Sequence, residues 1–335
     1  MINPNAHLVE NISDASKLEH LPTRDGYGRG VVVAGEKDER IVVITADLVE
    51  STRSHWFAEK FPERFIEVGV AEQNLAVVAA GMAVYGKIPF IASYATFSPG
   101  RNNEQIRTNI ALNNVPVKIV GCHAGVSVGP DGATHQALED LALMRVLPRM
   151  VVVSPCDAVE AEKATIALAF NNQPSYLRVA REKSPVFTTD KTPFEIGKAE
   201  IFRDPALAGQ VSDAAIIGCG PLVYNALKAA EELSKEGIEC EVVNCHTIKP
   251  IDEETIVKVA QNTGAVVSVE EHQIAGGLGS AIAEVLSRRH PTPQEFIGMQ
   301  DRFGESGSPS ELIEHFGMGV SNIKDAVRVA ISRKK

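Results

Sequence analysis

Residues 65–86 have the sequence FIEVGVAEQNLAVVAAGMAVYG, and residues 75–84 of this stretch include almost no polar side chain. A helix that is apolar on all sides is a buried helix. The pattern therefore predicts a helix over about 71–86 that lies inside the protein. Its first turn nevertheless carries Glu72. The helix dipole favours an acidic residue there, but a buried carboxylate must be paired or change its pKa, so Glu72 is also a candidate functional group.

Short apolar runs on both sides of this helix have the character of strands. They lack polar alternation, which is typical of parallel strands covered on both faces. The runs are RIVVITAD (40–47), IPFIASY (88–94), VPVKIVGCH (115–123), MVVVSPC (150–156) and SYLRVAR (175–181). Helical patterns lie between them, at about 71–86, 102–114, 135–147 and 157–171. The alternation predicts an α/β fold with an open, mostly parallel sheet.

This rhythm breaks once and then resumes. A segment with two prolines, several hydroxyl residues and charges interrupts it and is interpreted as a linker. Further strands are expected at 213–220, 238–245 and 265–271, with helices at about 222–236 and 252–263. The predicted organisation is an exposed, partly disordered N-terminal tail (1–20), a first domain (21–181), a linker (182–196) and a second, smaller α/β domain (197–335).

The composition is that of an ordinary globular protein. The chain has 335 residues, of which 44% are hydrophobic and 23% charged. A formal net charge of −10 argues against general affinity for nucleic acid, because little would neutralise the phosphates. No signal peptide or apolar window of membrane-spanning length is found, and the five cysteines form no CxxC pair. These features predict a cytoplasmic protein.

The loops that follow the strands are the first place to search for a site, since ligands of open α/β sheets bind beyond the carboxyl ends of the strands. The densest such segment is GCHAGVSVGPDGATHQALED (121–140), with four glycines, His123, Asp131 and His135. Glycines allow tight turns and close backbone approach to a ligand, and histidines can move protons or hold anions near neutral pH. The alternative is a glycine loop with His135 in the first turn of a helix. Two histidines and an aspartate within thirteen residues favour a site.

Three further residues, Arg24, Ser51 and Arg181, are candidate anion ligands. For each of them alone, a place on the surface or between domains is the favoured interpretation. Phosphate binding requires several such donors to converge, which a sequence does not show.

A set of motifs in this order and spacing resembles the second half of the thiamine-diphosphate-dependent transketolase family. The motifs are TRDGYGRG, ADLVEST, VGVAEQN, SYATFSPGR, GPDGATHQ and RVAR, followed in the second domain by VEEHQIAGGLGSAIAEVL and DRFGESG. The resemblance covers about residues 20–330 and implies a pyrimidine-binding domain followed by a transketolase C-terminal domain.

The resemblance implies a cofactor site for thiamine diphosphate. Glu72 would hydrogen-bond the ring nitrogen of the aminopyrimidine and favour its imino tautomer, while the hard chemistry belongs to the cofactor. Tyr94 and Phe97 match the aromatic pocket around the pyrimidine. Asp47 and Arg101 complete the implied cofactor-binding set.

It also implies a substrate site. Asp131 would contact a sugar hydroxyl and His135 would lie near the thiazolium, so both join Glu72 as catalytic residues. The implied ligands of the sugar phosphate are Arg24, Ser51, His123 and Arg181. His123 favours transketolase over the related deoxyxylulose-phosphate synthases, which usually lack a histidine at this place.

Two departures from the family pattern matter. Asn103 stands where an aromatic residue is expected, which puts one wall of the pyrimidine pocket in doubt. The chain also lacks the GDG motif that holds the metal and the diphosphate. We therefore expect no metal site on this chain. A separate N-terminal subunit would hold the diphosphate and Mg²⁺ or a similar divalent ion, in a heterotetramer with two copies of each subunit (alpha2-beta2).

The function implied is that of the C-terminal subunit of a two-subunit transketolase, which transfers a two-carbon ketol unit between phosphorylated sugars in the pentose phosphate pathway. One alternative is the beta subunit of another thiamine-diphosphate enzyme, either deoxyxylulose-phosphate-synthase-like or a 2-oxo-acid dehydrogenase. The motifs, with Arg24 and Arg181, argue against it. The other alternative is an inert homologous subunit. The intact Glu72, Asp131 and His135 argue against it, while Asn103 keeps it open.

Overall fold

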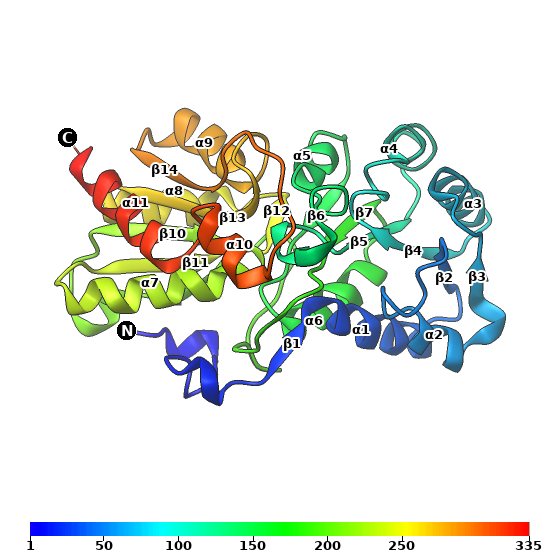
Figure 1. Ribbon diagram of the computed structural model, residues 1–335, viewed down its shortest axis with the longest axis horizontal. Helices are drawn as coiled ribbons and strands as arrows, with labels where there is room; N and C mark the ends of the chain where they lie inside the picture. Colours follow the sequence, from blue (N-terminus) through cyan, green and yellow to red (C-terminus); the bar gives the residue numbers. More distant parts are fainter. Residues whose placement is uncertain (335) are drawn as a thin grey trace.

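The computed structural model describes residues 1–334, which form two α/β domains side by side (Figure 1). The first domain has seven strands, β2 (Ile41–Thr45), β3 (Phe65–Glu67), β4 (Ile88–Tyr94), β5 (Lys118–Cys122), β6 (Val151–Val153), β7 (Ser175–Arg178) and β12 (Thr247–Lys249). Their order in the sheet is β12-β6-β7-β5-β4-β2-β3. All neighbours pair in parallel except β12, which the second part of the chain adds antiparallel to β6. The expected parallel α/β sheet is confirmed.

Helices cover both faces of this sheet. They are α1 (Thr23–Lys37), α2 (His55–Lys60), α3 (Glu72–Val84), α4 (Asn103–Gln105) with a π-helix (Ile106–Ala111), α5 (Asp140–Arg145) and α6 (Ala158–Ala169). Because side chains alternate along a strand, Val43 packs with α1 and α6 on one face. Its neighbour Ile44 packs with α3 and the π-helix on the other.

The glycine-rich segment TRDGYGRG forms the start of α1, a helix that the sequence patterns did not predict. Glycine usually destabilises a helix interior, but here it permits close packing against α6. A Cβ at Gly26 would lie 2.1 Å from the Ala158 carbonyl oxygen, and one at Gly30 would lie 2.7 Å from Thr165 Cβ. A contact between distant segments therefore decides this helix.

The second domain has a five-stranded sheet of β9 (Glu200–Arg203), β10 (Ala214–Gly218), β11 (Cys240–Asn244), β13 (Val266–Gln273) and β14 (Gln294–Met299), in the order β14-β13-β10-β11-β9. Only β9 is antiparallel to its neighbour. The helices are α7 (Val223–Lys235), α8 (Glu253–Thr263), α9 (Leu278–Arg289), α10 (Pro309–His315) and α11 (Val320–Ser332). The segment expected as a linker (182–196) contains a short strand, β8 (Lys183–Pro185). This strand pairs antiparallel with β1 (His20–Pro22) near the N-terminus. No helix of residues 1–334 has both the length and the apolarity needed to cross a membrane.

The N-terminal segment differs from the free, exposed tail that the sequence suggested. It lies along the second domain, near α7 in Figure 1. Ala6 and Ile12 are buried in the core of that domain, and the Tyr224 hydroxyl donates to the Ile12 carbonyl at 3.0 Å. The apolar residues of this segment are too few and too widely spaced for a sequence pattern to reveal this packing.

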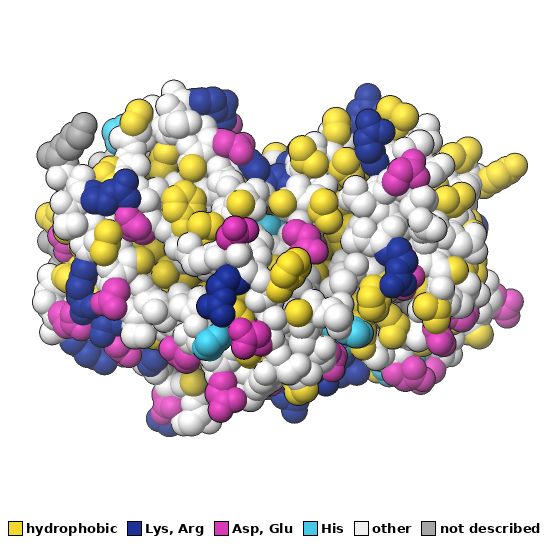
Figure 2. Space-filling model, turned by 45° about the horizontal axis from the view of Figure 1, so that its top comes forward, with side chains coloured by type: hydrophobic (Ala, Val, Ile, Leu, Met, Phe, Trp, Pro, Cys, Tyr) yellow, Lys and Arg dark blue, Asp and Glu magenta, His cyan; other side chains and the backbone are white. Residues whose placement is uncertain are grey.

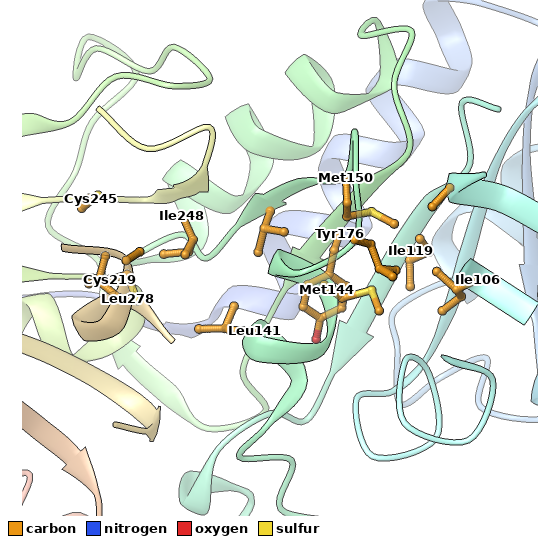
Figure 3. Close-up of a cluster of buried hydrophobic side chains, with 14 of the residues drawn as sticks. Ile106, Ile119, Leu141, Met144, Met150, Tyr176, Cys219, Cys245, Ile248 and Leu278 are labelled. Atoms are coloured by element: carbon orange, nitrogen blue, oxygen red, sulfur yellow. The ribbon is translucent and has the colours of Figure 1, made fainter. Parts of the chain in front are cut away.

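One buried apolar cluster runs through both domains (Figure 3). Ile119 and Met144 belong to its first-domain part, and Cys219 and Leu278 to its second-domain part. All five cysteines are free and buried. The two domains therefore share part of their core.

Candidate active site

The chain reverses its direction of travel across the sheet between β2 and β4. It passes from β2 to β3 on one side and then returns through α3 to β4 on the other side. Such a reversal opens a crevice beyond the carboxyl ends of the strands. Glu72 begins α3, Tyr94 ends β4 and His123 follows β5. The fold thus brings these expected site residues to one edge of the sheet.

Glu72 is 2% exposed at the N-terminus of α3. Arg101 Nη1 donates to Glu72 Oε2 at 2.9 Å, and within residues 1–334 this is the one hydrogen bond to that carboxylate. Asn102 Nδ2 donates to the Glu72 carbonyl oxygen at 2.9 Å and to Ser98 Oγ at 3.1 Å. The Arg101 guanidinium also lies over the Phe97 ring, with Cζ 4.7 Å from its centre. The buried carboxylate is therefore paired, and Oε1 remains free for a ligand.

Aromatic rings stand beside this carboxylate. Tyr94 stacks on His123 with ring centres 3.8 Å apart, and the Phe97 ring is tilted by 12° from the Tyr94 ring at 6.0 Å. His135 meets both with its edge, at 6.0 Å from Tyr94 and 5.4 Å from Phe97. The alternative that placed His135 in a first helical turn is wrong, because that helix begins only at Asp140. His135 is instead part of the aromatic cluster.

The cationic side chains meet on the far side of His123. Arg24 Nη1 donates to the Ser51 carbonyl oxygen at 2.9 Å and to His123 Nε2 at 3.2 Å. Burial, with the charges of Arg24 and Arg181, lowers the pKa of His123 to about 2. The imidazole is therefore neutral and can accept this hydrogen bond. Arg181 Nη1 lies 4.0 Å from Asp131 Oδ2, so the four expected phosphate ligands and Asp131 lie in one region.

A pocket of about 410 Å³ adjoins these cations, lined by Pro22, Arg24, Asp25, Arg53, Pro130, Arg181, Glu182, Lys183 and Pro309. Sequence reasoning missed Arg53 and Lys183, although each stands two residues after an expected ligand. Arg53 Nε donates to Asp25 Oδ1 at 2.6 Å, which holds it at the wall. Four cations and two acids line the pocket, and Asp131 lies at its edge, so the region keeps an excess of positive charge.

Several buried polar atoms near the carboxylate have no hydrogen-bond partner. They are Ser93 Oγ, Thr96 Oγ1, Asn102 Oδ1, Asn103 Nδ2 and Gln105 Oε1, together with His123 Nδ1. Buried polar atoms usually have partners, so these atoms are available to hydrogen-bond a ligand. Asn103, the departure from the family pattern, belongs to it.

Asp47 occupies a different position from the other expected cofactor ligands. It is exposed at the end of β2, and no hydrogen bond or ion pair of the described chain joins its side chain to Glu72 or to the aromatic cluster. Its N–H donates to Glu67 Oε1 at 2.8 Å, and Thr45 Oγ1 donates to Glu67 Oε2 at 2.6 Å. Glu67, which sequence reasoning missed, therefore shapes the ends of β2 and β3. Within residues 1–334, no group of three metal-ligating side chains is found.

The helix α3 is not buried on all sides as its sequence suggested. Val77 is 44% exposed, Val84 70% and the adjacent Tyr85 91%. Figure 2 shows hydrophobic side chains projecting at the right-hand edge of the molecule, where Figure 1 places α3. An apolar surface therefore lies on the same helix as the Glu72 carboxylate.

These features define a two-domain α/β protein with a ligand crevice at the carboxyl edge of a parallel sheet. Comparison with known proteins gives its family. Residues 19–186 match the model of the transketolase pyrimidine binding domain, and residues 207–323 match that of the transketolase C-terminal domain. The chain belongs to the transketolase family and carries these two domains in this order.

Individual relatives align along nearly their whole length. A putative transketolase C-terminal section from Methanocaldococcus jannaschii is 42% identical, over 93% of this chain and 96% of that protein. The 6-deoxy-6-sulfo-D-fructose transketolase subunit SqwH of a Clostridium species is 38% identical, over 95% and 97%. A solved structure described as a split gene transketolase, inactive beta4 tetramer, superposes with a TM-score of 0.87 at 42% identity, over 94% of this chain and all of that one. The chain thus corresponds to the beta subunit of a split transketolase-family enzyme.

Proposed function

We propose that this chain is the C-terminal subunit of a two-subunit transketolase that transfers a two-carbon ketol unit between phosphorylated sugars, as in the pentose phosphate pathway. The observation that carries the proposal is a path of side-chain contacts that connects a buried carboxylate to a cluster of cations. The carboxylate of Glu72 lies at one end and the cations around Arg24 at the other. The stacked rings of Tyr94 and His123, 3.8 Å apart, join them.

The residues at the carboxylate end fit the aminopyrimidine of thiamine diphosphate, which transketolase-family enzymes generally use with a divalent metal. When bound, this cofactor supplies an electron sink for cleavage of a carbon–carbon bond. Glu72 would hydrogen-bond the ring nitrogen, and Phe97 and Tyr94 would flank the ring. Arg101 would hold the carboxylate in position. The unpaired polar atoms around Asn103 support this fit, since they lack partners without a ligand.

Asp131 and His135 would act on the sugar. His135 touches the aromatic cluster and is half-buried, so it is placed to hold or move a proton at a substrate hydroxyl. Asp131 is exposed at the edge of the cationic pocket and can accept a hydrogen bond from another hydroxyl.

The phosphate of the sugar would lie against Arg24 and Arg181, with neutral His123 beside it. Charge-assisted hydrogen bonds from arginine are the strongest available to a phosphate. The positive charge of the pocket suits an anionic group, and we propose that this group is the phosphate of a sugar.

The carboxylate end requires a partner. We propose an N-terminal subunit that holds Mg²⁺ and the diphosphate and covers the apolar surface of α3, in a heterotetramer with two copies of each subunit. Large exposed apolar patches mark interaction sites, and Val84 and Tyr85 are among the most exposed apolar residues of the described chain. The free, buried cysteines support a cytoplasmic location.

The test is ketol transfer from xylulose 5-phosphate to ribose 5-phosphate with Mg²⁺ and thiamine diphosphate. The chain is assayed alone and then mixed with a candidate N-terminal subunit encoded by the neighbouring gene. We expect activity only in the mixture. Activity of the chain alone would contradict a site shared between two subunits. A complex that forms but has no ketol-transfer activity would favour an inert subunit or another substrate.

A further inference from the structure

The loop of residues 125–136, here called the substrate loop, carries Asp131 and ends beside His135. From the first domain, Arg181 Nη1 donates to the Val128 carbonyl oxygen at 2.7 Å. The opposite side of the loop contacts the second domain. The proposed function has so far assigned no role to that domain.

Glu271, near the end of β13 in the second domain, is the main polar contact. It is 4% exposed. Its Oε1 accepts the Ser127 N–H at 2.6 Å, and its Oε2 accepts the Ser127 hydroxyl at 3.1 Å. Arg178 Nη2 donates to the Glu271 carbonyl oxygen at 2.8 Å, which connects Glu271 to the sheet of the first domain. A charged acceptor with two donors on one loop residue fixes the loop strongly.

Gln136 makes a second connection at the other end of the loop. Its Nε2 lies 3.1 Å from the Val126 carbonyl oxygen and 3.3 Å from that of Gly129. It also donates to the Glu305 carbonyl oxygen of the second domain at 2.9 Å. One buried amide group therefore ties the loop to itself and to the second domain.

The glycines of the loop meet the second domain. A Cβ at Gly125 would lie 2.3 Å from Glu271 Oε1, and one at Gly132 would lie 2.6 Å from Ser306 Oγ. Both residues also have positive φ angles, 88° and 74°. These glycines permit the close approach of another domain, whereas the sequence suggested the close approach of a ligand.

We propose that Glu271 is a positioning residue through which the second domain holds the substrate loop, and with it Asp131 and His135, in the geometry that binds the sugar. The role of the loop in binding sugar rests on the proposed function. The contact between the domains does not, so the two can be tested separately.

The first experiment measures backbone hydrogen exchange of residues 125–136 in the isolated chain. In Glu271→Ala we expect roughly 10- to 100-fold faster exchange, since a hydrogen bond to a charged group contributes about 1.5–3 kcal/mol. Glu271→Gln should restore most of the protection, because its amide oxygen still accepts the Ser127 N–H. The matched control is Glu284→Gln, which breaks an ion pair between the domains with Arg145 and leaves the loop untouched.

The second experiment measures steady-state kinetics in the assembled enzyme. Glu271→Ala should raise KM for ribose 5-phosphate about tenfold, by loss of part of that hydrogen-bond energy, with a smaller change in kcat. Unchanged loop exchange in Glu271→Ala, or equal loss in Glu284→Gln, would overturn the proposal. If the wild-type mixture has no activity, the proposed function fails, while the exchange result still decides whether Glu271 holds the loop.

Discussion

The two ends of the crevice differ in how completely this chain builds them. At the cationic end, Arg24 and Arg181 each donate to a backbone carbonyl oxygen of their own chain and line an open pocket. At the carboxylate end, Glu72 has a single donor, and several buried polar atoms nearby have none.

This difference indicates which steps the isolated chain can perform and which steps require a partner. A pocket whose charges are already positioned can bind an anion without further assembly. A carboxylate beside unpaired polar atoms and an exposed apolar helix needs a cofactor and a partner. We therefore expect anion binding by the isolated chain and catalysis only in the complex, and four substitutions test this comparison.

The largest expected effect is that of Glu72→Gln. In the assembled enzyme we expect kcat to fall about 10²- to 10⁴-fold, the usual contribution of a group that acts in proton transfer. Binding of inorganic phosphate to the isolated chain, measured by calorimetry, should not change. Glu63→Gln, on an exposed side chain of the same domain, is the control. Turnover within threefold of the wild type in Glu72→Gln would remove Glu72 from the chemistry.

Arg24→Gln should have the opposite profile. We expect KM for ribose 5-phosphate to rise about 10- to 100-fold, since a charged hydrogen bond is worth about 1.5–3 kcal/mol, with a much smaller change for the unphosphorylated acceptor glycolaldehyde. Arg40→Gln removes an exposed cation paired with Asp38 and serves as the control. Equal losses for both acceptors would show that Arg24 does not bind the phosphate.

His123 gives the cationic end a pH dependence. Because the folded-state pKa of His123 is lowered to about 2, only the unfolded chain takes up its proton as the pH falls below about 6.5. The wild type should therefore lose roughly 2 kcal/mol more than His123→Asn between pH 7 and pH 5. Urea unfolding at both pH values measures this difference. His7→Asn, at an exposed histidine, should behave like the wild type, and a protonated His123 in the folded chain would abolish the effect.

The smallest effect concerns Arg53, which sharpens the choice of anion. In Arg53→Gln the pocket loses one of the four cations that line it. We expect KM for ribose 5-phosphate to rise about three- to tenfold, in keeping with a partly exposed charge, and KM for the sulfonate analogue of the same sugar to rise less. Arg29→Gln removes an arginine of α1 paired with Glu162 and is the control. Equal changes in KM for both anions would mean that Arg53 does not help to distinguish a phosphate from a sulfonate.

Local patterns predicted a large part of this architecture. The apolar strands and the helix that begins at Glu72 were visible because periodicity and burial follow from neighbouring residues in the chain. The placement of Arg24, Ser51, His123 and Arg181 together came only from the ordered motifs of a family. Arg53, Glu67 and Glu271 were missed because each acts through a contact with a distant segment, for which no pattern within a short window exists.

The sequence by itself determined the α/β class and the place of most apolar strands, since these depend on composition and periodicity. Tertiary structure decided that α1 is a helix despite its glycines, because packing against α6 outweighs local propensity. It also decided that the N-terminal segment lies on the second domain, that α3 presents an apolar surface, and that Glu271 reaches Ser127 across the domain boundary. The physical reason is the same in each case. Burial and hydrogen bonding depend on which distant segments contact each other, and the interaction energy of two segments does not follow from the local sequence of either one.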